Sequence, residues 1–283
     1  MVKTMNTEQG VNIPAWTGWV LMGSLAALCL FVGNLIGSLT GFPYYDGYQG
    51  SLTQQPLSIA LLSLLVITLA TMLMLRINMI WIVVLDARMA ASLSLVTIAG
   101  LSMRAGGMRS IMQAAGGPQL FWWLAAELSI LLVVVCLVNV AAFALTSSKP
   151  AARASTDWSA AGIQAAIFAL AMWILGQSPL KAQGVWSVVA SGILAGFLTH
   201  LLIGRTWRWS WGIPLVVGIV GYVANALTAT GVDVAKLSGP VAGLALASPL
   251  DYAAAGPLGM MLGELLTREH HDADDDAGNT ANA

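Results

Sequence analysis

Long uninterrupted runs of apolar residues constrain this chain more than any other feature. About 20 apolar residues in a helix cross the ~30 Å hydrocarbon core of a bilayer, where only helices and closed barrels satisfy the backbone. Only 9% of the residues are charged, against roughly 25% in soluble domains. The sequence therefore predicts an all-α, polytopic transmembrane bundle. Its clearest spans are 16–38, 57–75, 119–145, 158–175, 185–203 and 210–230.

A seventh span is expected between the second and third of these runs. No glycine or proline interrupts the chain from Leu57 until Gly100, so one helix would be too long for a single crossing. Tryptophan and arginine favour the headgroup level, so Arg76, Asn78 and Trp81 indicate an interfacial turn at 76–81. A span at 82–103 would follow. The alternative is one long tilted helix over 57–85, followed by a short interfacial helix.

The eighth span is expected at 240–266, where three prolines fall within an otherwise apolar segment. Proline removes a helical hydrogen bond, so Pro240, Pro249 and Pro257 predict a discontinuous helix. The first apolar run is too long for a typical signal peptide and ends without a small-residue cleavage site. We interpret it as a retained span.

The distribution of lysine and arginine predicts the orientation. With eight spans and both termini cytoplasmic, the inner side holds eight basic residues and the outer side four, whereas omitting the 82–103 crossing gives seven to five. We expect an integral protein of a bacterial inner membrane. The inner set is Lys3, Arg76, Arg88, Lys149, Arg153, Arg205, Arg208 and Arg268, and the outer set is Arg104, Arg109, Lys181 and Lys236.

The domain organisation predicted is one bundle over 1–268, followed by a disordered acidic tail over 269–283. A polar linker at Ser147–Asp157 divides the bundle into possible halves, 1–146 and 158–268. No repeat is evident between the halves at the residue level, and a duplication stays open. Close helix packing within the monomer is expected at four GxxxG spacings: Gly33/Gly37, Gly192/Gly196, Gly239/Gly243 and Gly259/Gly263.

The sequence lacks the residues that several classes of function require. A net charge of −1 without a basic cluster argues against a nucleic-acid partner. No phosphate-binding loop or cluster of metal ligands stands within the spans, and we predict no cofactor and no metal. Ser191 and His200 share one helix, about 13 Å apart along its axis and on roughly opposite faces, so they cannot form a nucleophile–base pair.

Asp251 is the sharpest functional candidate. It is expected near the middle of the last span, between Pro249 and Pro257. A carboxylate in hydrocarbon is costly, so it usually faces a cavity or the protein interior and marks a transport path. Broken helices expose backbone groups to substrates in many transporters. The alternative is a re-entrant or tilted segment that leaves Asp251 at a wet surface.

Five further polar residues complete the candidate path. Glu127 is expected about one turn inside the outer surface, and Asp86 and Arg88 near the opposite interface. Asn225 can join helices by hydrogen bonds, and His200 is the only histidine within a predicted span.

These residues favour a permease-like protein for a small solute or ion, with Asp251 as its proton- or cation-responsive group. The alternative is a non-catalytic membrane subunit or scaffold of a larger complex, and an enzyme comes third. The partners expected are the lipid bilayer and a small solute or cation. A polar cavity reaching Asp251 would separate transport from scaffolding.

Overall fold

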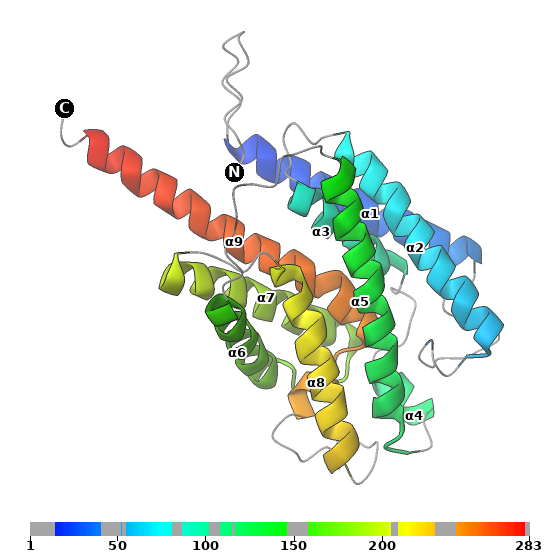
Figure 1. The fold of residues 1–283 in the computed structure, drawn as a ribbon. Helices are drawn as coiled ribbons and strands as arrows, with labels where there is room; N and C mark the ends of the chain where they lie inside the picture. The colour runs from blue at the N-terminus through cyan, green and yellow to red at the C-terminus, as the bar shows by residue number, and fades with distance from the viewer. Residues whose placement is uncertain are drawn as a thin grey trace.

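The computed structural model describes residues 15–40, 52, 55–80, 87–101, 108–114, 117–145, 158–204, 209–229 and 242–280. Within these ranges every regular element is a helix (Figure 1), which confirms the predicted all-α transmembrane bundle. The α-helices are α1 (Ala15–Thr40), α2 (Leu57–Met79), α3 (Ala87–Leu101), α4 (Met108–Ala114), α5 (Leu120–Leu145), α6 (Trp158–Leu175), α7 (Lys181–Ile203), α8 (Ile213–Thr228) and α9 (Pro249–Thr280). Two short 3₁₀ turns, η3 (Ser210–Gly212) and η5 (Ala242–Ala245), precede α8 and α9.

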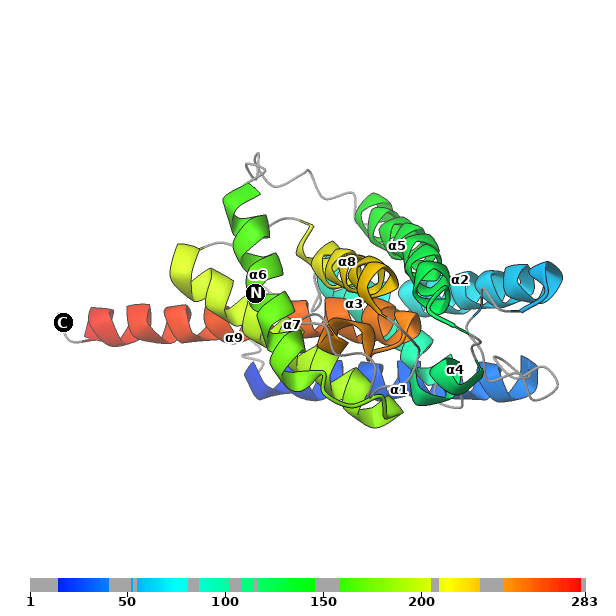
Figure 2. The ribbon, with the colours of Figure 1, turned by 90° about the horizontal axis from the view of Figure 1, so that it is seen from below.

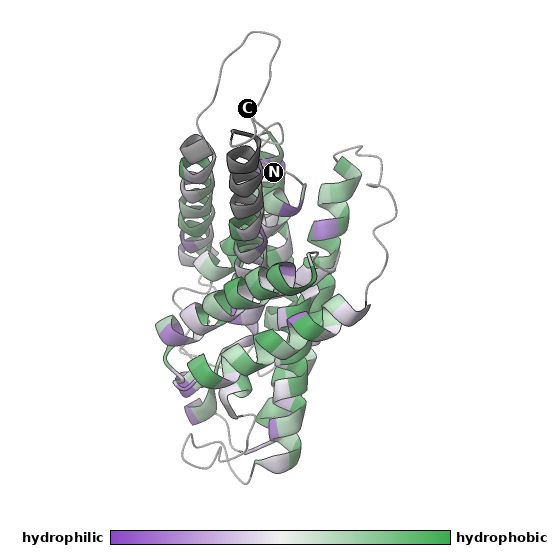
Figure 3. Cartoon of the chain, turned by 90° about the vertical axis from the view of Figure 1, so that its left-hand side faces the viewer, coloured by the Kyte–Doolittle hydropathy of each residue, from purple (hydrophilic) through white to green (hydrophobic). Residues whose placement is uncertain are grey.

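Among the described residues, six helical segments are long and apolar enough to cross a membrane: α1, α2, α5, α6, α7 and η3 continued into α8. They correspond to the six clearest runs of the sequence. Their outward faces carry large apolar side chains, such as Leu39, Leu57 and Trp158. Apolar colour also dominates the helices in Figure 3. Because such a surface suits lipid rather than water, the chain is an integral membrane protein.

The other two expected spans form the centre of the bundle. Helix α3 has 15 residues, about 22 Å of helix, and thirteen of them are buried. The side chains of α9 are buried over most of residues 249–267. Helix α3 packs against α1, α2, α5 and α9, while α9 packs against α7, α3, α5 and α8. These two helices therefore hold the bundle together.

Two parallel helix pairs are built on close glycine contacts. In the first, a Cβ on Gly33 of α1 would lie 2.3 Å from the carbonyl oxygen of Thr97 and 3.0 Å from Cα of Gly100 in α3. In the second, a Cβ on Gly192 of α7 would lie 2.9 Å from Cα of Gly259 in α9. The monomer packing predicted for Gly33, Gly192, Gly196, Gly259 and Gly263 is confirmed.

The two pairs run in opposite directions. Helices α1 and α3 point one way along the bundle, and α7 and α9 point the other way (Figures 1 and 2). The α3 and α9 helices are antiparallel neighbours, since Arg88 at the start of α3 meets Glu264, well beyond the start of α9. These directions are the ones that eight alternating crossings would produce.

A short sequence repeat accompanies this arrangement, and the glycine contacts are what single it out. Residues 33–40 read GNLIGSLT and residues 192–199 read GILAGFLT, so five of eight positions match. The first glycine of each copy is the one that packs on Gly100 or Gly259. The same spacing in sequence separates Gly33 from Gly100 and Gly192 from Gly259.

The expected break between a second and a third helix is present, but the sequence placed the end of the second helix too early. Helix α2 continues to Met79, and Asn78 is fully buried. Its side-chain amide donates to Ser94 Oγ at 2.9 Å and to the carbonyl of Ala90 at 3.5 Å, which ties α2 to α3. Trp81 and Asp86 lie outside the described residues. The alternative of a continuous helix to residue 85 also fails to fit, because Ile80 is already in a turn.

The last helix also differs from expectation. The predicted discontinuity lies at residues 246–248, between η5 and α9, but Pro257 does not end α9. The helix then continues to Thr280, through most of the 269–283 tail for which disorder was predicted. Its C-terminal part extends away from the other helices in Figure 1.

Candidate functional site

Over residues 249–267, whose side chains the structure describes, helix α9 carries two buried carboxylates, each facing a basic side chain from another helix. Asp251 pairs with Lys181 of α7, and Glu264 pairs with Arg88 of α3. Both carboxylates are more than nine-tenths buried. Their separation in sequence places them about 20 Å apart along the helix axis. We call these contacts the Asp251 pair and the Glu264 pair.

Asp251 closes a capping box at the start of α9. The Ser248 backbone N–H donates to Asp251 Oδ2 at 3.0 Å, and the Asp251 N–H donates to Ser248 Oγ at 3.3 Å. The Ser248 hydroxyl also donates to Oδ2, at 2.7 Å. Pro249 occupies the first helical position, where its missing N–H costs nothing. Ser-Pro-Leu-Asp is thus a helix start, and a carboxylate there is favoured by the helix dipole.

Lys181 supplies the positive charge of the Asp251 pair. Its ammonium group donates to Asp251 Oδ1 and lies 3.4 Å from Ser248 Oγ. Lys181 is the first residue of α7, and its side chain is 21% exposed, against 2% for Asp251. The pair therefore stands at the beginning of both parallel helices. The two sequence interpretations expected Asp251 at the middle of a long helix or at a wet surface. It lies instead in the first turn of α9 and is buried.

Two tyrosines hold the non-helical segment that precedes α9. Tyr222 of α8 donates its hydroxyl to the carbonyl of Ala247, and Tyr252 donates to the carbonyl of Leu244 at 2.6 Å. Their rings meet edge to face, with centroids 6.1 Å apart. A broken helix frees backbone carbonyls that must be satisfied in an apolar interior. These hydroxyls satisfy two of them.

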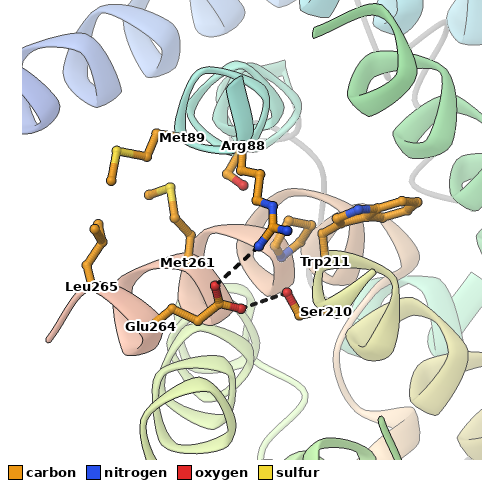
Figure 4. Close-up of a pocket in the computed structure, with 9 residues that line it drawn as sticks. Arg88, Met89, Ser210, Trp211, Met261, Glu264 and Leu265 are labelled. Atoms are coloured by element: carbon orange, nitrogen blue, oxygen red, sulfur yellow. Dashed lines mark hydrogen bonds and ion pairs between the residues drawn. The ribbon is translucent and has the colours of Figure 1, made fainter. Parts of the chain in front are cut away.

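The Glu264 pair lies toward the other end of α9. Arg88 Nη1 stands 3.9 Å from Glu264 Oε2, and the Ser210 hydroxyl donates to Oε1 at 2.8 Å. Figure 4 shows the three side chains converging from α3, α9 and η3 beside Trp211. They line a cavity of about 20 Å³ together with Ser92 and Met261, among others. That volume holds about one water molecule.

The other predicted path residues that the structure describes stand on α5, α8 and α7. Glu127 is buried in α5 and lines a separate groove. Asn225 is buried in α8 and donates to the carbonyl of Gly221 at 2.8 Å. His200 is half-buried near the end of α7, where its carbonyl accepts the Gly204 N–H. Asp86 lies outside the described residues.

Sequence reasoning missed the partners of both pairs. Lys181 was counted only as a flanking charge, and Glu264 was not singled out. The signals were present for both: Ser248-Pro249-Leu250-Asp251 matches the capping-box pattern, and Glu264 is a carboxylate within an apolar stretch. The helix with which each would pair could not be read from one sequence.

The fold and the apolar surface define an all-helical integral membrane protein. Comparisons with protein-family models, with curated proteins and with solved structures give no match. What the protein does must therefore be inferred from its own residues.

Proposed function

We propose that this protein is a permease for a small solute or ion, and that the two ion pairs on α9 close its opposite ends. The observation that carries the proposal is the placement of Asp251 and Glu264. Both are buried on one central helix, about 20 Å apart, and each is paired across a helix–helix interface. A pair of this kind can separate without unfolding its helices.

The inverted arrangement of the two glycine-packed pairs supports the same proposal. Many transporters are built from repeats of opposite orientation, and one repeat rocks against the other around a central site. Here α1 with α3 and α7 with α9 are tightly packed units related in this way, and residues 33–40 and 192–199 share a motif. We infer that they descend from a duplication. The Glu264 pair joins the two units, while the Asp251 pair lies within the second.

The proposed orientation places the Glu264 pair at the cytoplasmic end. Arg76, at the end of α2, and Arg88, at the start of α3, stand on the side predicted to be inner. At the other end, the backbone N–H of Arg109 donates to the carbonyl of Pro179, beside Lys181. Arg109 and Lys181 both belong to the set predicted to be outer. The reason for this orientation is the predicted excess of basic residues on the inner side, eight against four.

A non-catalytic scaffold is the second candidate, and one observation favours it. The Asp251 carboxylate accepts hydrogen bonds from the Ser248 N–H, the Ser248 hydroxyl and Lys181. In this alternative, so completely engaged a carboxylate serves only to start α9 and to fix it against α7. Under this alternative the pairs would stay closed throughout the life of the protein.

The permeability of proteoliposomes separates the two candidates. We would reconstitute the parent chain, Lys181→Met, Arg88→Met and the double variant, and follow swelling in glycerol, glycine and KCl by light scattering. If each pair closes one end, each single variant remains closed at the other end. The double variant alone should then swell, for at least one of the three solutes.

The scaffold alternative predicts four equally tight preparations, and that result would overturn the permease proposal. A single variant that swells as fast as the double variant would also contradict the proposal that each pair closes one end. Leakage from misfolded protein is controlled by Ser24→Ala, which removes only a local hydroxyl contact to the Val20 carbonyl. Swelling rates are compared only among variants whose thermal stability in detergent is equal.

A further inference from the structure

An open groove lies between α2 and α5, at the end of the bundle where both helices stop. The two helices run side by side (Figures 1 and 2). Leucines of α2, among them Leu69 and Leu73, face Ala141, Ala144 and Leu145 of α5 across the groove. Its volume is about 490 Å³, which is within the range of ligand cavities. The described lining residues take no part in either ion pair of α9.

Arg76, in the last turn of α2, is the only charged residue among the described residues that line this groove. The others are leucine, methionine or alanine. Arg76 is exposed, and within the described part of the chain its guanidinium group has no ion-pair partner. A guanidinium keeps its positive charge at any pH that a cell reaches. The groove therefore joins a permanent positive charge to an extended apolar wall.

The length of α2 places this groove at the level of one leaflet of the bilayer. Helix α2 has 23 residues, about 34 Å of helix, and so reaches from one headgroup region to the other. A long basic side chain in its last turn can extend to the headgroups. From Arg76 back to Leu69 the groove follows α2 for about 10 Å, less than half of the ~30 Å hydrocarbon core. The acyl chain of a lipid in that leaflet therefore fits along the groove with its headgroup beside Arg76.

We propose that this groove binds an anionic phospholipid, whose phosphate pairs with Arg76 while one acyl chain lies between α2 and α5. Leu69 and Leu73, which are 61% and 53% exposed, cover the chain on the α2 side. Ala141 and Ala144 leave room for it on the α5 side, because their side chains are small. The guanidinium can donate two parallel hydrogen bonds to a phosphate group. In the orientation predicted from the basic residues, this lipid belongs to the cytoplasmic leaflet.

Charge complementarity selects this occupant over the other lipids of a membrane. A zwitterionic lipid brings an ammonium group as well as a phosphate, and none of the described lining residues is acidic and able to receive it. A neutral lipid covers the leucines but offers Arg76 no anion. A small inorganic anion pairs with Arg76 but leaves the apolar wall uncovered. This inference does not depend on the ion pairs of α9 acting as gates.

The test measures lipid binding to the full chain by native mass spectrometry. The chain is stripped of copurified lipid in detergent and titrated with phosphatidylglycerol or phosphatidylethanolamine carrying the same two acyl chains. The dissociation constant of the first bound lipid is determined for each. Arg76→Gln keeps a polar side chain but removes the charge, and Ala144→Trp fills the groove without changing its charge. The matched controls are Arg109→Gln, which removes an exposed arginine of α4, and Val140→Trp, which adds the same ring at an exposed position of α5 outside the groove.

We expect the parent chain and both controls to bind phosphatidylglycerol more tightly than phosphatidylethanolamine. Arg76→Gln should bind phosphatidylglycerol about fivefold more weakly, the loss expected for one basic residue at a membrane surface, and should lose the preference. Ala144→Trp should weaken the binding of both lipids, and it replaces Arg76→Gln if that variant does not fold.

Equal affinity of the folded parent for the two lipids, or unchanged binding in either folded groove variant, would overturn the proposal. Full competition by glycerol 1-phosphate would do so as well, because the site would then take a free phosphate. Displacement of phosphatidylglycerol by an equal concentration of palmitate would mean that a fatty acid is the ligand. A parent chain that appears as a dimer without bound lipid would mean that a second copy covers the groove, which also contradicts a lipid site.

Discussion

Gly192 and Gly259 lie so close together that neither position has room for a side chain. A Cβ on Gly259 would stand 2.4 Å from the carbonyl oxygen of Val189, one turn before Gly192, and backbone cannot move aside cheaply. This contact fixes α7 against α9 and so positions Lys181 beside Asp251. The same type of contact, between Gly33 and Gly100, fixes α1 against α3.

Substituting these glycines by alanine should destabilise the protein. Gly259→Ala and Gly33→Ala each force backbone apart, and we expect each to lower the free energy of unfolding by about 1–3 kcal/mol. Gly162→Ala is the matched control, because a Cβ there meets nothing within 4 Å. The control should be neutral or slightly stabilising, since alanine favours helix. Thermal unfolding in detergent measures all three, and equal melting temperatures would contradict the packing.

The hydrogen bond between Asn78 and Ser94 should couple α2 to α3. We expect Asn78→Ala to cost about 1 kcal/mol, within the range for polar contacts between membrane helices. The double variant with Ser94→Ala should cost less than the two single losses combined. Cysteine at position 78 should be as protected from aqueous thiol reagents as cysteine at 94, because both side chains are buried. Additive losses, or rapid labelling at 78, would show that α2 ends earlier.

Removing the charge of Asp251 should destabilise the start of α9. Asp251→Asn leaves the Lys181 ammonium without its anion and weakens the capping box, so we expect a loss of about 2 kcal/mol. In the Lys181→Met background, Asp251→Asn should cost distinctly less. A double-mutant cycle on unfolding free energies measures this coupling. A coupling energy of zero in this cycle would mean that the two charges do not interact.

The orientation proposed for the bundle is checked with one-sided reporters. A reporter fused after residue 283 should be active on the cytoplasmic side, and one inserted near Gly47 should be active outside. The reason is the excess of lysine and arginine on the predicted inner side. Activity of both reporters on the same side would contradict eight crossings.

Hydropathy alone was sufficient for the fold class and for six helices, because apolar runs of this length have few alternatives in a membrane. It misplaced the end of α2 because Arg76 and Asn78 looked like interfacial residues. In a bundle, a buried asparagine can instead join two helices, as Asn78 does with Ser94. Local polarity therefore predicts a helix end poorly where a polar partner is available on a neighbouring helix.

The candidate site was predictable only in part. Asp251 was identified by its cost in hydrocarbon, but its role in starting α9 depends on Ser248, and its charge partner is Lys181. Glu264 becomes a candidate only through its ion pair with Arg88, which lies on a helix far away in sequence. Such pairings come from the way α3, α7 and α9 pack, and that packing depends on glycine contacts rather than on hydropathy.

The most direct test of the proposed gates is reciprocal accessibility at the two ends of α9. Single cysteines would replace Ser92, which lines the cavity of the Glu264 pair, and Gly184, where a Cβ would stand 3.5 Å from Asp251 Oδ2, an ordinary contact. Both are placed in a chain in which Cys29 and Cys136 are alanine. Labelling rates with a membrane-impermeant maleimide are measured from each side of reconstituted vesicles.

We predict that Glu264→Gln speeds the labelling of position 92 and slows that of position 184, whereas Asp251→Asn does the reverse. Each substitution opens one end, and the bundle then favours closure of the other. Labelling rates that stay unchanged at both positions, or that rise together in both variants, would contradict alternate closure by the two ion pairs.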